Sequence, residues 1–219
     1  MLGFLSVLMV LALGYAYLVE GVFTAFLMCC NVIGAGLVAF NFWEPLADLL
    51  EPSFRGTFLG GYEDGLSLVL LFSVTLAFLR LLTNNLANTR IEFDERVQTV
   101  GGAFFGVVTG YLTAGFLVCV LQTMPFHQKF LGFDAKFDPQ QAGLRRVLPP
   151  DRVWLAMMSR ASLVAFSNGD ENPTFDQSGS FEARYARYRR YTDEGGPQSY
   201  SGELDQELRA RPGTIGTIP

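Results

Sequence analysis

Long runs without charge dominate the first 126 residues of the chain, and charged residues gather mainly after them. The hydrocarbon core of a bilayer is about 30 Å thick, so a helix needs about 20 mostly apolar residues to cross it. Only Arg80 interrupts the third run, and its long side chain can reach the membrane boundary. The pattern predicts four transmembrane helices, within residues 2–19, 21–43, 65–89 and 97–126.

The first two runs are separated only by Glu20, which Gly21 follows. One straight helix over residues 1–43 would be roughly 65 Å long, about twice the bilayer core. We therefore expect the chain to fold back at Glu20-Gly21, because glycine permits a tight turn. No basic residue precedes Arg55, so the first run lacks the basic start of a signal peptide and is predicted to remain as a membrane helix.

The remaining segments differ in composition from the spans. An acidic connector with Pro45 and Pro52 is expected at residues 44–64, between the second and third spans. Two short helices are predicted after the fourth span, at about 151–167 and 180–191, and the last residues have the Gly, Pro, Ser and acidic content typical of disorder. The fold class is therefore an all-α polytopic membrane protein with a small helical and disordered C-terminal tail. Its predicted parts are a four-helix membrane domain (1–126), a peripheral segment (127–191) and a tail (192–219).

Composition narrows the possible chemistry. The chain has 16 basic and 21 acidic residues, a formal net charge of −5, so no nucleic-acid partner is expected. The three cysteines lie inside apolar runs, where they are expected to pack as small soft residues. His127 is the single histidine, and no phosphate-binding or dinucleotide-binding motif occurs. We therefore predict no catalytic site, no metal site and no cofactor.

Small residues recur every four positions in the fourth span. On a helix each is displaced by about 40° from the last, so together they form a shallow groove that another helix can approach closely. The groove holds Gly102, Gly106, Gly110 and Ala114. A candidate partner surface on the second span holds Cys30, Gly34, Ala35 and Ala39. The groove could pack within this chain, pack against another copy or protein, or act as a hinge.

Two further features carry polar groups that need partners. Asn31 lies near the middle of the second span, where it can form an interhelical hydrogen bond or contact a substrate. Arginines and tyrosines alternate at a three-residue spacing near the C-terminus, which fits a solvated helix, a contact with anionic lipid headgroups, or RNA or partner binding. The candidate residues for the lipid-surface contact are Arg184, Arg187, Arg190, Tyr185 and Tyr188.

The stretches "DERVQTVGGAFFGVVTG" and "YLVEGVFTAFL", together with the order of the spans, resemble the colicin V production family. That family typically has an Asp-Arg pair before a glycine repeat, here Asp94 and Arg96, and a charged residue before Gly at the start of the second span. The resemblance covers about residues 10–125. Glu20 and Thr109 depart from it, since basic residues are common at those positions in the family. The resemblance implies a bacterial inner-membrane protein linked to colicin V production or export and to envelope physiology.

Three functions therefore remain open. The first is a non-enzymatic membrane protein that acts through helix–helix contacts with another copy or a secretion partner. The second is a small channel or transporter subunit. The third is a membrane anchor for a tail that binds a partner or the lipid surface. The distribution of basic residues favours cytoplasmic termini by the positive-inside rule.

Overall fold

The computed structural model describes residues 2–54, 57, 59–87, 94–126, 149–165, 175, 181, 184 and 185. These residues form five helices and no strand. The helices are α1 (Leu2–Glu20), α2 (Val22–Phe54), α3 (Glu63–Ala87), α4 (Glu95–Thr123) and α6 (Pro150–Ala165). The first four are long and apolar enough to cross a membrane. The prediction of an all-α fold with four membrane-spanning helices is confirmed.

The chain reverses direction at Gly21, between α1 and α2. Its φ of 93° lies in the left-handed region, which glycine adopts without the steric cost that a side chain would bring. The amide of Gly21 still donates to the carbonyl of Tyr17 at 3.3 Å. The expected fold-back at Glu20-Gly21 is therefore confirmed.

The acidic connector predicted at residues 44–64 is helical over residues 44–54, so the helix of the second span is longer than its uncharged run. α2 continues through Pro45 and Pro52 and ends at Phe54. A proline inside a helix removes one backbone hydrogen bond and crowds the carbonyl four residues before it, which is why the sequence indicated a break. Both prolines follow Trp43, where the chain becomes acidic, and carbonyls freed there can bond to water instead of lying unpaired in lipid.

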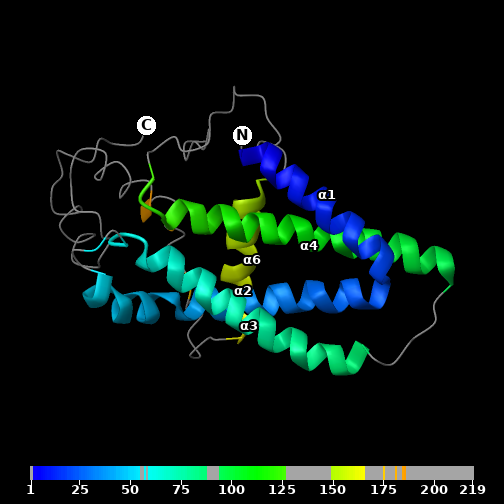
Figure 1. Ribbon diagram of the computed structural model, residues 1–219, viewed down its shortest axis with the longest axis horizontal. Coiled ribbons are helices and arrows are strands. Elements are labelled where there is room, and N and C mark those ends of the chain that lie inside the picture. The colour runs from blue at the N-terminus through cyan, green and yellow to red at the C-terminus, as the bar shows by residue number, and fades with distance from the viewer. Residues whose placement is uncertain are drawn as a thin grey trace.

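α2 and α4 form the centre of the bundle. α3 packs along α2, and α1 packs along α4, so that α1 meets α2 mainly at their shared turn (Figure 1). The turn between α1 and α2, the end of α3 and the start of α4 lie together at one end of the bundle, which we call the hairpin end. α2 ends, α3 begins and α4 ends at the opposite end, as four antiparallel spans require.

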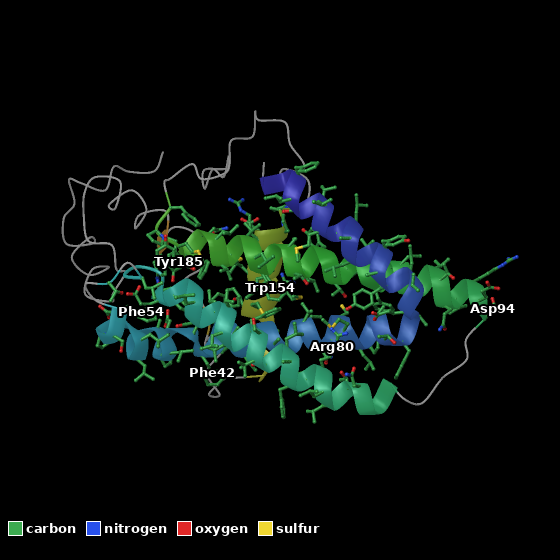
Figure 2. The ribbon with its side chains drawn as sticks, in the orientation of Figure 1. Phe42, Phe54, Arg80, Asp94, Trp154 and Tyr185 are labelled. Atoms are coloured by element: carbon green, nitrogen blue, oxygen red, sulfur yellow. The ribbon has the colours of Figure 1, made fainter. Side chains whose placement is uncertain are left out.

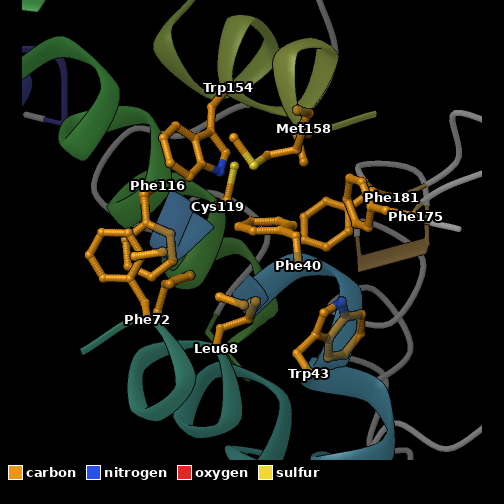
Figure 3. Close-up of a cluster of buried hydrophobic side chains, with 14 of the residues drawn as sticks. Phe40, Trp43, Leu68, Phe72, Phe116, Cys119, Trp154, Met158, Phe175 and Phe181 are labelled. Atoms are coloured by element: carbon orange, nitrogen blue, oxygen red, sulfur yellow. The ribbon is translucent and has the colours of Figure 1, made fainter. Parts of the chain in front are cut away.

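α6 lies across the bundle instead of along it. Figure 1 shows it nearly perpendicular to α2 and α4. The aromatic core gathers where α2, α3, α4 and α6 meet (Figure 3). Phe72 and Phe116 stack with ring centres 3.9 Å apart, and Phe40 meets Phe116 and Trp154 edge to face at 6.2 and 6.1 Å. Such pairs add about 0.5–1.5 kcal/mol each beyond area burial in water, so the core ties the crossing helix to three spans.

Candidate functional site

The glycine groove of α4 is filled by α1 of the same chain. A Cβ at Gly102 would lie 2.5 Å from the carbonyl oxygen of Tyr17, and one at Gly106 would lie 2.9 Å from the Cβ of Tyr17. A Cβ at Gly110 would lie 2.8 Å from the Cα of Val10. Packed carbon atoms sit at about 3.5–4.0 Å, so only glycine permits this approach. The three glycines therefore set the distance between the backbones of α1 and α4.

The surface proposed as the partner of this groove packs elsewhere, so that assignment was wrong. Gly34 faces α3, where a Cβ would lie 3.1 Å from Cδ1 of Leu79. Ala35 and Ala39 belong to the aromatic core, and Cys30 is exposed. The four-residue spacing of small residues specifies a close approach but not which helix makes it. Ala114, the last position of the groove, is buried.

A second pair of glycines, not singled out from the sequence, receives α6. A Cβ at Gly36 of α2 would overlap the Trp154 ring, and one at Gly115 of α4 would overlap the carbonyl oxygen of Pro150. Trp154 is fully buried between these two helices (Figure 2). The small residues in "GAG" at 34–36 and "TAG" at 113–115 were the sequence signal for this close approach. The sequence alone does not show that a later helix crosses both spans at these positions.

Buried polar contacts fix α6 in this position. Nε2 of Gln122 donates to Oδ2 of Asp151 at 3.0 Å, and the hydroxyl of Ser162 donates to Oδ1 of Asn41 at 2.7 Å. The first bond joins α6 to α4 and the second joins it to α2. A buried donor or acceptor without a partner destabilises the folded protein. A shift of α6 along the bundle would break both bonds, so they favour a single register of α6.

The C-terminal residues Arg184 and Tyr185 bind the bundle, which corrects their assignment to a lipid surface. Tyr185 is fully buried, and its hydroxyl donates to Oδ2 of Asp64 at 2.8 Å. Nη1 of Arg184 donates to Oε1 of Glu44 at 2.8 Å. Glu44 lies in α2 and Asp64 in the first turn of α3, and Glu44 supplies the charge opposite to that of Arg184. The other three residues of that assignment, Arg187, Tyr188 and Arg190, lie outside the described residues, as do residues 192–219.

Asn31 joins two spans near the hairpin end. Its Nδ2 donates to the hydroxyl of Thr83 at 2.9 Å, and that hydroxyl in turn donates to the carbonyl of Leu79. The bond joins α2 to α3. It occupies the side-chain amide of Asn31, which the sequence offered either for an interhelical hydrogen bond or for a substrate contact. Beside it lies an open, shallow pocket with a volume of about 30 Å³. Its polar lining is Tyr17, Glu20, Thr24, Asn31, Arg80, Thr83 and Asn84.

The described residues include no group of three or more His, Cys, Asp or Glu side chains placed to hold a metal ion. Cys29 and Cys119 are buried and Cys30 is exposed, and Sγ of Cys119 donates to the carbonyl of Asp151 at 3.8 Å. His127 lies outside the described residues. The described part contains packed helices, buried hydrogen bonds, a buried carboxylate beside Tyr185 and a polar pocket.

A family model described as "Colicin V production protein" matches residues 2–137. The match contains all four membrane-spanning helices and ends before α6. No curated protein and no solved structure matches the chain.

Proposed function

The chain belongs to the colicin V production family, and we propose that it is a non-enzymatic protein of the bacterial inner membrane that supports colicin V production or export, or envelope homeostasis. It acts through helix–helix and protein–protein contacts, with its termini on the cytoplasmic side. Four spans of the required length support a multi-pass membrane protein, and family membership supports the link to colicin V production.

One face of α1 carries this proposal. Val10, Leu13, Gly14 and Tyr17 face the α4 groove. A separate row of large side chains follows a spacing of four, three and four residues and is exposed, with Phe4 at 72% and Tyr15 at 73%. We call this row the outer face of α1: Phe4, Leu8, Leu11 and Tyr15.

A four-three spacing is the seam with which one helix packs on another in a coiled coil. Lipid tails are as apolar as leucine, so a helix face of this kind can pack either against lipid or against another membrane helix. The glycine groove of α4 is already occupied within the chain, so the outer face of α1 is the surface that we assign to a second copy or a secretion partner.

The alternative of a channel or transporter subunit would use polar side chains of the spans along a path. The candidates for such a path are engaged in other bonds. Thr109 and Thr113 donate to carbonyls of their own helix at 2.7 Å each, and Asn31 bonds Thr83. A membrane anchor with an independent tail is also less favoured, because α6, Arg184 and Tyr185 pack on the membrane helices.

A secretion assay tests the proposal. A bacterium that exports colicin V, but lacks its own family member, would express this chain, and toxin activity would be measured in the medium. We expect Leu8→Ala with Leu11→Ala to lower export, because the pair shortens two side chains of the outer face without touching the groove. The matched control is Val74→Ala with Phe78→Ala, which shortens two exposed side chains of α3.

Immunoblots of the membrane fraction would check that each variant accumulates equally. Full export by the α1 variant at normal abundance would contradict a role for the outer face. Failure of the unaltered chain to restore any export or envelope phenotype would contradict the proposed function itself.

A further inference from the structure

The polar pocket at the hairpin end sits where helices leave the apolar layer. Glu20 is the last residue of α1, and Arg80 lies seven residues, or about 10 Å, before the end of α3 at Ala87. Asn31 lies about 14 Å along α2 from its start. The pocket therefore reaches from the headgroup level into the upper part of the hydrocarbon layer.

The pocket combines one positive and one negative side chain that do not bind each other. Among the described residues neither Glu20 nor Arg80 has an ion-pair partner within 4.0 Å, although both line the same space. A single charge near a membrane is costly without a partner. Two opposite charges held apart are satisfied together by a ligand that carries both signs at a matching separation.

The rest of the lining fits the same ligand. Asn84 adds a side-chain amide next to Arg80, and guanidinium and amide N–H groups are good donors to phosphate oxygens. Leu27 and Met28 form the apolar part of the wall, which suits the first methylenes of an acyl chain. The pocket is open and not enclosed, as a site must be for a lipid whose tails remain in the bilayer.

We propose that this pocket binds the headgroup of a zwitterionic phospholipid of the phosphatidylethanolamine class. Arg80 and Asn84 hold the phosphate, Glu20 holds the ammonium group, and the lipid tails leave past Leu27 and Met28. An anionic headgroup such as phosphatidylglycerol leaves Glu20 unpaired beside a phosphate. A soluble zwitterion has no tail to cover the apolar wall. This site is separate from the outer face of α1 on which the proposed function rests.

Native mass spectrometry of the purified, delipidated full chain measures the binding. The probes are short-chain phosphatidylethanolamine, short-chain phosphatidylglycerol and the soluble glycerophosphoethanolamine. We expect the chain to bind phosphatidylethanolamine about tenfold more tightly than phosphatidylglycerol. Only the first lipid has an ammonium group that can donate a charge-assisted hydrogen bond to Glu20. Glycerophosphoethanolamine is expected to bind more weakly than either lipid.

Two variants assign the charges. Glu20→Gln is expected to bring the ratio of the two lipid affinities close to one, and Arg80→Gln to weaken both about tenfold. Arg96→Gln, an exposed arginine near the same end of the bundle, serves as the matched control and should bind like the unaltered chain. If Arg80→Gln does not fold, Glu20→Gln alone decides the question.

An unchanged lipid preference in Glu20→Gln would overturn the proposal. Tighter binding of phosphatidylglycerol would indicate a general attraction of arginine to anionic lipid. Equal binding of glycerophosphoethanolamine and the lipid would indicate a soluble ligand. Either result would also reject the proposed occupant.

Discussion

The close contact between α1 and α4 makes Gly102→Ala the sharpest test of the fold. The new Cβ would lie 2.5 Å from the carbonyl oxygen of Tyr17. That oxygen belongs to the backbone of a helix, so it cannot rotate away as a side chain can. α1 must move outward by about 0.5–1 Å to restore an ordinary contact distance. Overpacking of this kind costs about 1–3 kcal/mol.

A second alanine variant separates this cost from helix propensity. Alanine is favoured over glycine in a helix interior by up to about 1 kcal/mol, and that gain would partly hide the clash in Gly102→Ala. Gly3 also lies in a helix, but a Cβ there meets nothing within 4 Å. We therefore expect Gly3→Ala to be neutral or stabilising. Gly3 lies in the first turn of α1, where alanine gains less than in a helix interior, so the difference between the two variants is a lower bound on a steric term of about 1–3 kcal/mol.

Unfolding of the purified protein in mixed detergent micelles, followed by far-UV circular dichroism as the denaturing detergent is increased, would measure both variants. The reasoning requires that Gly102→Ala unfold earlier than the unaltered chain and that Gly3→Ala does not. Equal stability of the two variants would refute the conclusion that the groove sets the backbone distance. Gly106→Leu extends the series. A Cβ at this position would already lie 2.9–3.1 Å from three atoms of α1, so we expect this variant also to unfold earlier than the unaltered chain.

Three further predictions follow from the described contacts. A Cβ at position 14 would lie 3.1 Å from Cγ2 of Val107, so Gly14→Cys with Val107→Cys, in a chain whose native cysteines are replaced, should form a disulfide within one chain. A dimer band on a non-reducing gel would instead place α1 in the groove of another copy. Trp154→Ala should destabilise the protein by about 3–5 kcal/mol, whereas Val153→Ala, which is partly exposed, should be mild; similar melting of both would contradict the buried site of α6. Tyr185→Phe should cost about 1–3 kcal/mol because a buried carboxylate of α3 loses its donor, and unchanged protection of the C-terminal segment from protease would count against that bond.

The spans and the hairpin could be predicted because their causes are local. The thickness of the bilayer fixes the length of each uncharged run, and Gly21 marks the one place where the chain must turn. The continuation of α2 to Phe54 could not be predicted in the same way. Pro45 and Pro52 are strong breakers on their own, but their cost depends on whether the freed carbonyls face lipid or water, which no short stretch of sequence reveals.

The pairings across the bundle could not be predicted for a different reason. Arg184 and Glu44 are 140 positions apart, and Tyr185 and Asp64 are 121 apart. An Arg-Tyr repeat has the same pattern whether its partner is a lipid headgroup or a carboxylate of the same chain. The glycine repeat shows a similar ambiguity, because the spacing specifies that some backbone comes close and leaves its identity open.

α4 accepts two helices on two different faces. Gly110 and Gly115 are five positions apart, so they point about 140° away from each other; the first faces α1 and the second faces α6. α1 is bound to the rest of the bundle mainly through the groove, and it also carries the outer face and Glu20. Displacing α1 with Gly102→Ala should therefore weaken both export and lipid selectivity, while Gly115→Ala, which displaces α6, should leave the pocket at the hairpin end intact. Loss of lipid selectivity in Gly115→Ala but not in Gly102→Ala would mean that α1 does not form the pocket wall assigned to it.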